Sequence, residues 1–276
     1  MSTNTPSIAS VIRCRLCSGE LKDKFSLEIL NKYDVRYFQC QSCGSLQTEP
    51  AYWLTEAYKV NLSNLDTGAV QRNWHNFFVI YLLCKVFKLN NVFDLGGGDG
   101  LLCRFLRDYE INCFVKDEYA TPTYAQGFTV PNFDVPDLVL GFEVWEHLPN
   151  PLEDLERFFN KKPKVLLITT TPYENQDKDW WYLSAETGQH IFFYSPQALE
   201  RVAKKYGYEL HVIQNFLLFI KNDFSSKVKL YIFKKSLRGK LNRFFKYKIM
   251  MKNTPGVWKD YLDQKSLLEQ KFKKLP

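Results

Sequence analysis

Apolar residues recur at two different spacings along this chain. From Val70 to Leu89 they return every three or four residues, which is the period of an amphipathic helix. Short apolar runs follow this segment, and we expect each of them to be a buried strand. These runs lie at 91–95, 112–115, 137–142 and 164–170.

Segments with helical spacing separate these runs. Ser195 and Pro196 provide an N-cap and a first-turn proline, so a helix is expected to begin there. The predicted helices are 101–109, 152–160 and 196–205. Two last apolar runs, 208–213 and 216–221, can pair as an antiparallel hairpin. Strands that alternate with helices predict an α/β fold, with a mostly parallel sheet covered on both faces.

Four cysteines near the N-terminus form two C-x-x-C pairs separated by 22 residues. They are Cys14, Cys17, Cys40 and Cys43. Each pair is closely followed by a glycine (Gly19 or Gly44), where metal-binding turns need a left-handed residue. Zinc prefers four such thiolates, so we predict a closed, structural zinc site, and two disulfides or four incidental thiols are the alternative. A hairpin around Asn31 fills the gap between the pairs.

A glycine cluster, DLGGGDG at 94–100, follows the first predicted strand and opens a helix. Glycines let the backbone approach a ligand closely, and a helix N-terminus favours an anionic group. Leu101 stands where the third glycine of a dinucleotide fingerprint belongs, and there is no P-loop lysine. Asp117, at the end of the next strand, suits a ribose, and Asp94 places negative charge beside the loop. A nucleoside with a cationic group fits this pattern better than a pyrophosphate.

From Asp94 to about Lys221 the chain resembles the class I methyltransferases that depend on S-adenosylmethionine (SAM). The resemblance rests on DLGGGDG, on Asp117 and on GFEVWEHLPNP at 141–151. With the cysteine module in front, the whole chain is similar to zinc-containing sugar methyltransferases of antibiotic and bacterial surface-polysaccharide pathways. The resemblance implies a Rossmann-like, doubly wound, seven-stranded sheet, mostly parallel with a C-terminal antiparallel hairpin, and SAM as the methyl donor.

The same resemblance implies roles for individual residues around SAM. The ribose is expected to bind Asp117, with Glu118 as the alternative carboxylate. Glu143, which follows a strand at the same edge, is also expected to bind SAM. Asp94 faces the cationic part of SAM, and Asn132 and Asp134 are candidates for the adenine contact. The glycines expected to line the methionine and ribose are Gly96, Gly98 and Gly100.

The acceptor is expected beyond the carboxyl ends of the strands. Residues 171–195 form a long, aromatic segment there, which suits either a lid that stacks on a sugar or a hydrophobic plug over the sheet. His190 is the candidate general base, oriented by Glu186 and supported by Tyr173, and Glu143 is a further catalytic candidate; the alternative is that His190 only holds the lid. His147 is expected to anchor the helix after its strand.

Composition narrows the class of protein. Apolar residues make up 45% and charged residues 24%, which excludes a largely disordered, collagen-like or coiled-coil chain. The odd number of cysteines, seven, does not favour a disulfide framework. Residues 1–10 lack a secretory signal, and no apolar run is long enough to span a membrane. We therefore expect a soluble, cytoplasmic protein.

Positive charge is confined to one segment. Residues 221–252 hold eleven Lys or Arg against Asp223, a balance of +10 within a net charge of +7, so the rest of the chain sums to −3. Within it, 227–252 has the spacing of an amphipathic helix. Three roles are open for this helix: it docks on the domain, it lies on a membrane surface, or it binds a polyanion such as nucleic acid.

These observations predict four regions and a SAM-dependent methyltransferase. The acceptor is expected to be small and anionic, such as a nucleotide-linked sugar or a surface-glycan precursor. An RNA methyltransferase that uses the zinc ribbon and basic tail is one alternative, and a catalytically silent SAM-binding partner protein is another. The regions are a zinc ribbon at 1–50, a linker and leading helix at 51–90, the SAM-binding domain at 91–222 and a basic helical extension at 223–276.

Overall fold

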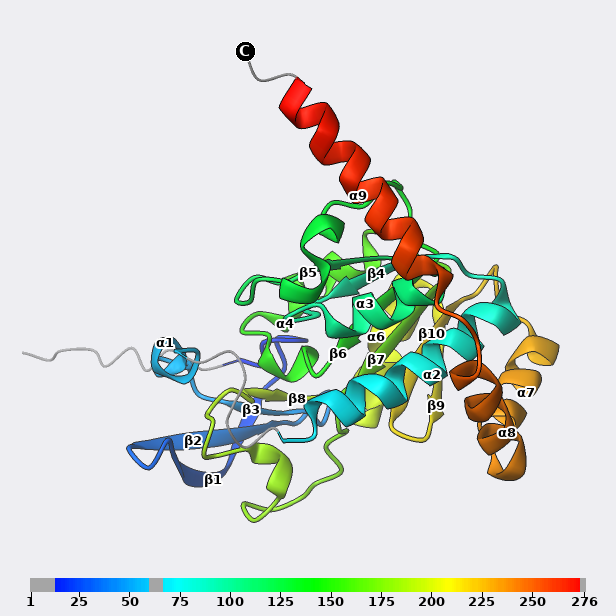
Figure 1. Cartoon of the computed structure of the whole chain (residues 1–276). Helices are drawn as coiled ribbons and strands as arrows, with labels where there is room; N and C mark the ends of the chain where they lie inside the picture. Colours follow the sequence, from blue (N-terminus) through cyan, green and yellow to red (C-terminus); the bar gives the residue numbers. More distant parts are fainter. Residues whose placement is uncertain (1–12, 60–66, 274–276) are drawn as a thin grey trace, which may run out of the picture.

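The computed structural model describes residues 13–59 and 67–273. Residues 1–10, for which no secretory signal is predicted, lie outside this part, as does 60–66 of the predicted linker. The main sheet has the order β5-β4-β6-β7-β10-β9 (Figure 1). Its strands are β4 (Asn91–Leu95), β5 (Asn112–Lys116), β6 (Leu138–Phe142), β7 (Val165–Thr169), β9 (Tyr208–Ile213) and β10 (Phe216–Lys221). The first four are parallel, and β10 runs antiparallel to both β7 and β9.

The predicted strands and the final hairpin are confirmed within one or two residues, but the described chain forms six strands in this sheet instead of seven. The edge strand β5 has no further neighbour on its outer side. Residues 119–136 follow it and contain a 3-10 helix, η1 (Thr123–Phe128). The three prolines of this segment, Pro122, Pro131 and Pro136, lack the N–H groups that a sheet ladder needs.

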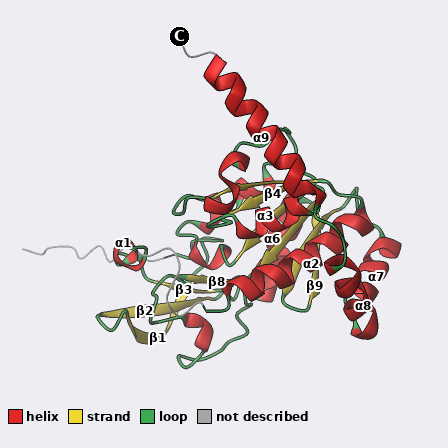
Figure 2. Ribbon diagram, in the orientation of Figure 1, coloured by secondary structure: helices red, strands yellow, loops and turns green. Residues whose placement is uncertain are grey.

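Helices cover both faces of the main sheet (Figure 2). Phe216 and Phe219 of β10 are separated by an odd number of positions, so their side chains point to opposite faces. His75 of α2 stacks on Phe216 and Phe159 of α5 packs on Phe219, which places these two helices on different sides. The helices around the sheet are α2 (Ala69–Phe87), α3 (Leu101–Asp108), α4 (Pro151–Asp154), α5 (Glu156–Phe159) and α6 (Pro196–Tyr206).

The predicted N-cap of α6 is present, because the Ser195 hydroxyl accepts a hydrogen bond from the Ala198 N–H, 3.0 Å away. The single helix expected over 152–160 is instead divided into α4 and α5, which meet at Leu155. The leading helix and the helix after the glycine cluster lie where their periodicity predicted them.

A second, antiparallel sheet joins the cysteine module to the methyltransferase-like part of the chain. Its strands, in order, are β1 (Leu21–Ile29), β2 (Tyr33–Cys40), β3 (Leu46–Thr48) and β8 (Phe192–Phe193). The predicted hairpin around Asn31 is therefore present, but the module is not self-contained: β8 pairs with β3 and comes from the segment after β7. The short helix α1 (Leu54–Ala57) follows β3.

The C-terminal extension is divided into three helices. They are α7 (Lys227–Ser236), α8 (Gly239–Met250) and α9 (Pro255–Lys273). The one amphipathic helix predicted over 227–252 is broken at Gly239, whose φ is +53°. Phe233, Leu237 and Ile249 dock on the body, whereas Phe244 stays half exposed. Asp260 anchors α9 to Arg104 and Arg107 of α3, and beyond this anchor α9 projects from the body (Figure 1). No helix within the described ranges is both long and apolar enough to cross a membrane.

Candidate functional site

The glycine loop leaves β4 at Leu95 and ends where α3 begins. Gly96, Gly98 and Gly100 all have positive φ, between +56° and +82°, which side-chain-bearing residues rarely adopt. A Cβ on Gly96 would lie 2.5 Å from a methyl carbon of Val144, which follows the neighbouring strand β6. A Cβ on Gly98 would meet no atom within 4 Å. The loop is therefore fixed by close packing at Gly96 and open at Gly98.

Asp117 holds this loop in place. Its Oδ2 accepts the Gly98 N–H at 2.9 Å, and its Oδ1 accepts the N–H groups of Tyr119 and Ala120 at 2.8 Å each. A carboxylate offers about four acceptor positions. Three are taken by the backbone, so Asp117 retains room for about one further hydrogen bond. Glu118, the alternative carboxylate, is exposed and pairs with Arg157.

Asp94 lies beneath the loop and is only 2% exposed. A Cβ on Gly97 would come within 2.4 Å of its Oδ2, and this oxygen has no hydrogen-bond partner among the described residues. Burial, and then the charge of Asp117, raises the pKa of Asp94 to about 7. A cationic ligand group at this position would supply the missing partner.

Glu143 follows β6 at the same edge of the sheet. Its φ is +53°, and its N–H donates to both the carbonyl oxygen and the Oγ1 of Thr169, at 3.2 and 3.1 Å. The Thr169 hydroxyl in turn donates to Oε1 of Glu143 at 2.7 Å. These three bonds bind the strained turn after β6 to the end of β7.

His190 lies beside His147, with ring centroids 4.9 Å apart. Nδ1 of His190 lies 2.7 Å from the carbonyl oxygen of Tyr182, which can only accept. Nδ1 therefore carries the hydrogen, and Nε2 carries the lone pair that a general base requires. Burial lowers the pKa of His190, so the ring is neutral near pH 7.

His147 and Glu146 belong to a short 3-10 helix after β6, η2 (Trp145–His147). His147 faces the carbonyl oxygen of Gln189 through Nδ1, at 3.0 Å, and burial lowers its pKa to about 3. Glu146 is fully buried and accepts the Tyr182 hydroxyl at 2.7 Å. Burial, and then the charge of Glu143, raises the pKa of Glu146 to about 8. The anchoring role predicted for His147 is thus accompanied by a direct contact with His190.

Two residues predicted to assist His190 lie elsewhere. Glu186 is exposed, and the Tyr182 carbonyl orients the imidazole in its place. Tyr173 is buried in a core cluster, and its hydroxyl has no partner among the described residues. Sequence reasoning missed Tyr182, because a backbone carbonyl and a single hydroxyl leave no spacing signal. It also missed Tyr58, whose hydroxyl lies 3.0 Å from Nδ1 of His147.

The aromatic segment 171–195 packs against the cysteine module and does not form a free lid. It contains the short helix η3 (Trp181–Leu183) and β8. Five of its seven aromatic side chains are at most 2% exposed, whereas Trp180 is partly buried and Trp181 is 76% exposed. Tyr173, Tyr182 and Phe193 pack against the β1–β2–β3 sheet, and Phe192 and Tyr194 pack in the main core. The plug interpretation therefore describes this segment better than an aromatic stacking surface. The buried aromatics are Tyr173, Tyr182, Phe192, Phe193 and Tyr194.

The four predicted metal ligands converge. All four sulfur atoms lie within 4.8 Å of one another, with Sγ–Sγ distances of 3.7 Å for Cys14 and Cys43 and 3.5 Å for Cys17 and Cys40. Zn–S bonds of about 2.3 Å in a tetrahedron place sulfurs about 3.8 Å apart. The cluster therefore has the donors and the size of a zinc site.

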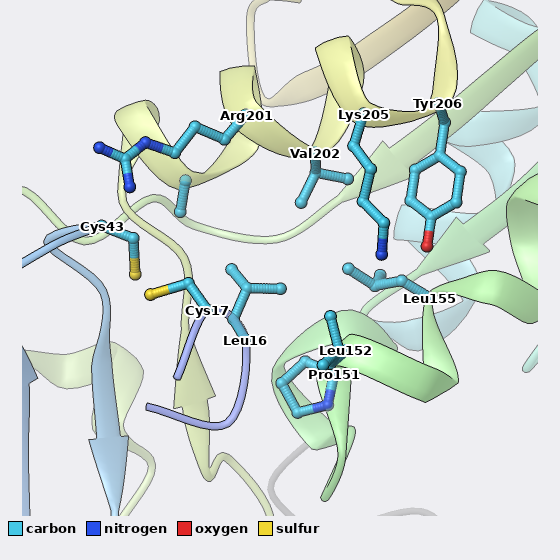
Figure 3. A pocket seen from close by; sticks show the side chains of 11 residues that line it. Leu16, Cys17, Cys43, Pro151, Leu152, Leu155, Arg201, Val202, Lys205 and Tyr206 are labelled. Carbon is cyan, nitrogen blue, oxygen red and sulfur yellow. The ribbon is translucent and has the colours of Figure 1, made fainter. Parts of the chain in front are cut away.

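A pocket of about 240 Å³ adjoins this cluster (Figure 3). Cys17 and Cys43 lie at one end of it, Arg201 and Lys205 come from α6, and Leu152 comes from α4. It lies on the side of the cysteines, away from the glycine loop, so it is not part of the site at the sheet edge.

Arg15 connects the cysteine turn to the loops that carry the two histidines. Its guanidinium donates to the carbonyl oxygens of Ile191 (2.5 Å) and Pro149 (3.2 Å), and more weakly to Thr48 (3.4 Å). No carboxylate pairs with it within the described chain, and burial lowers its pKa to about 10. Because Ile191 adjoins His190, the first C-x-x-C turn is bonded directly to the backbone beside the candidate base.

A family model and several solved structures are similar to this chain. The family model described as a methyltransferase domain matches residues 70–213. No curated protein matches the chain. Among solved structures, the methyltransferase domain of bacterial CtHen1 is 18% identical, with 54% of this chain and 98% of that chain covered and a TM-score of 0.38.

Two further solved structures are similar over part of the chain. An O-methyltransferase family protein from Burkholderia thailandensis is 17% identical, covers 51% of this chain and 54% of its own, and has a TM-score of 0.40. Magnesium protoporphyrin IX methyltransferase from Synechocystis, with bound SAH, is 13% identical. The match covers 61% of this chain and 92% of that chain, with a TM-score of 0.40. The family model spans more than half of the 276 residues, including the glycine loop and both histidines. The chain therefore belongs to the methyltransferase-domain family and is a methyltransferase.

Proposed function

We propose that this enzyme transfers a methyl group from SAM to a small, anionic acceptor, such as a nucleotide-linked sugar or a surface-glycan precursor. The observation that supports this proposal is the position of two features at one sheet edge. The glycine loop follows β4, and the turn after the adjacent parallel strand β6 leads to His147. The ring of His147 contacts that of His190, which comes from the segment after β7.

The residues around the loop fit SAM. Gly98 leaves open space for a ligand to approach the backbone, and Asp117 keeps one acceptor position for a ribose hydroxyl. Asp94 keeps an unpaired oxygen beneath the loop, which suits the ammonium group of the methionine part. When bound, SAM supplies a methyl group that its positive sulfur makes electrophilic.

The removal of a proton from the acceptor is assigned to His190. As the acceptor forms its bond to the methyl carbon, it loses a proton, and the lone pair on Nε2 of His190 receives it. Tyr182 keeps this lone pair on Nε2, because its carbonyl oxygen holds the Nδ1 hydrogen. Holding the methyl donor and the acceptor in line contributes more to the rate than proton removal does. The contacts that anchor the segment around His190 are therefore important for the rate.

Zinc at Cys14, Cys17, Cys40 and Cys43 completes the proposal. Four thiolates leave no open coordination position, so the metal has a structural role. Because β3 of this module pairs with β8, two residues after His190, zinc stabilises the acceptor side as well as the module itself.

Turnover tests the assignment of His190. SAH formation from SAM is measured with a panel of nucleotide-linked sugars and surface-glycan precursors, for the wild type, His190→Asn and the control His211→Asn. His211 lies in β9, outside the cluster. We expect a loss of 10²–10⁴-fold in kcat for His190→Asn with unchanged SAM affinity, and no loss for the control. Undiminished turnover in His190→Asn would remove the base from the proposal.

The basic extension supports RNA as a second candidate acceptor. Residues 227–252 contain ten Lys or Arg and no acid. Charge of this density binds a polyanion with an affinity that falls steeply with salt. Methylation of an RNA pool that depends on these residues and collapses between 50 and 200 mM salt would favour this acceptor over a sugar.

A further inference from the structure

Three side chains beside the proposed methyl acceptor site form a compact group of metal-ligating type. Glu146, His147 and His190 each offer a donor atom, and these atoms lie within 4.8 Å of one another. Methyl transfer as proposed above uses His190 alone. Glu146 and His147 therefore require a separate explanation.

The two imidazoles are held as metal-binding histidines are held. Nδ1 of His147 faces the carbonyl oxygen of Gln189, and Nδ1 of His190 faces that of Tyr182. Carbonyl oxygens only accept, so His190 carries its hydrogen on Nδ1 and a lone pair on Nε2. At His147 the Tyr58 hydroxyl shares Nδ1 with the Gln189 carbonyl, and the carbonyl favours the same tautomer. Backbone carbonyls that fix the tautomer in this way are typical partners of histidine ligands. Both histidines are partly exposed as residues.

Glu146 is the group that most needs a partner. Its side chain is fully buried, Oε1 accepts the Tyr182 hydroxyl at 2.7 Å, and Oε2 has no hydrogen-bond partner among the described residues. No Lys or Arg of the described chain pairs with it. A buried polar oxygen without a partner is costly and rare in folded proteins. A cation at this oxygen would remove that cost.

We propose that Glu146, His147 and His190 bind one divalent transition-metal ion of the Mn²⁺, Fe²⁺ or Zn²⁺ class. Two imidazoles and a carboxylate suit these ions, and they leave coordination positions open. Ligand atoms about 2.1 Å from a common ion lie roughly 3–4 Å apart, so small side-chain rotations suffice to close the site. The four-thiolate cluster is softer and selects zinc, which separates the two sites chemically.

The proposal deepens the proposed function, and its catalytic consequence rests on that function. A hydroxyl that coordinates a divalent cation loses its proton more readily. With the ion bound, Nε2 of His190 is a ligand and no longer receives the proton; the metal instead lowers the pKa of the acceptor hydroxyl, and the released proton passes to solvent water. Tyr182 serves both arrangements, because its hydroxyl holds Glu146 and its carbonyl holds His190.

Metal binding is measured directly on the full chain. Total metal per chain is determined by mass spectrometry, and Mn²⁺ is then titrated while the electron paramagnetic resonance signal of free Mn²⁺ is followed. Glu146→Gln retains an acceptor for the Tyr182 hydroxyl and removes the charge. His75→Ala is the control, since His75 packs on Phe216, outside the cluster. One zinc per chain and unchanged SAH affinity show that each variant is folded.

The expected result is one metal ion per chain beyond the zinc at the cysteines, either copurified or taken up as Mn²⁺. Glu146→Gln is expected to weaken it by at least about 10-fold, and His75→Ala to leave it unchanged. Folded wild type that takes up no second ion, or an ion equally well bound by Glu146→Gln, overturns the proposal. Failure of SAH to bind contradicts the proposed function instead, so the two failures are distinguishable.

Discussion

Replacing Arg15 by methionine tests whether the cysteine module positions the acceptor side. Methionine keeps an unbranched apolar stem and removes the guanidinium. The two shorter hydrogen bonds, to Ile191 at 2.5 Å and Pro149 at 3.2 Å, are worth ~1.5–3 kcal/mol each for a charged donor, or roughly 3–6 kcal/mol together. Burial opposes them: the fall in the pKa of Arg15 from 12.5 to about 10 corresponds to roughly 3 kcal/mol. The expected net loss of stability is therefore small, about 1–2 kcal/mol.

The expected loss of rate is larger. Without Arg15, the backbone at Ile191 loses its shortest side-chain bond, and a displacement of about 1 Å at the neighbouring His190 costs about 10²-fold. We expect kcat to fall 10–100-fold while zinc content and SAM affinity stay at wild-type values. Arg13→Met is the matched control, because Arg13 is exposed and only distantly paired with Glu20. A zinc-replete Arg15→Met enzyme with wild-type kcat would refute the reasoning.

Three further predictions concern the donor loop and the metal. Gly98 and Gly207 both have a positive φ and open space where a Cβ would lie, so each alanine substitution is expected to cost about 1 kcal/mol of stability. Calorimetry is expected to show weaker SAM binding for Gly98→Ala alone. Equal affinities in the two variants would place the ligand elsewhere. Since folding raises the pKa of Asp94 from its ordinary value to about 7, the folded state holds an extra proton between about pH 4 and 7, and stability falls as pH rises through that window. At pH 8, Asp94→Asn is therefore expected to be more stable than the wild type by up to about 4 kcal/mol, to unfold at a higher temperature and to bind SAM more weakly. A lower melting temperature would contradict this. Cys40→Ser is expected to lose zinc and to raise the hydrogen-exchange rate of the β3 and β8 amides, whereas unchanged exchange would separate the metal from the acceptor side.

The sequence predicted the elements in which a local pattern decides the structure. The strand at 91–95, the glycine loop and the Ser195 cap follow from short stretches of chain, and all are present. The four cysteines converge because their paired spacing is itself a constraint. The catalytic assignment to His190 remains a prediction, now with a defined tautomer.

What the sequence did not predict depends on contacts between distant residues. Two residues of β8 complete the sheet of the cysteine module, and a strand of that length has no periodicity to detect. Tyr58 reaches His147 across 89 positions. Tyr182 lies only eight positions from His190, but it contacts the ring through its backbone carbonyl, which no residue pattern reveals. Gly239 divides a helix whose apolar spacing continues across it, so periodicity alone predicted one helix.

Isothermal titration with SAH tests the central claim most directly, because the claim requires the glycine loop to hold the demethylated donor. The account predicts one SAH bound per wild-type chain, with affinity reduced in Gly98→Ala and kept in Gly207→Ala. A folded, zinc-containing wild type that binds no SAH, or that binds it equally well after Gly98→Ala, would contradict the account.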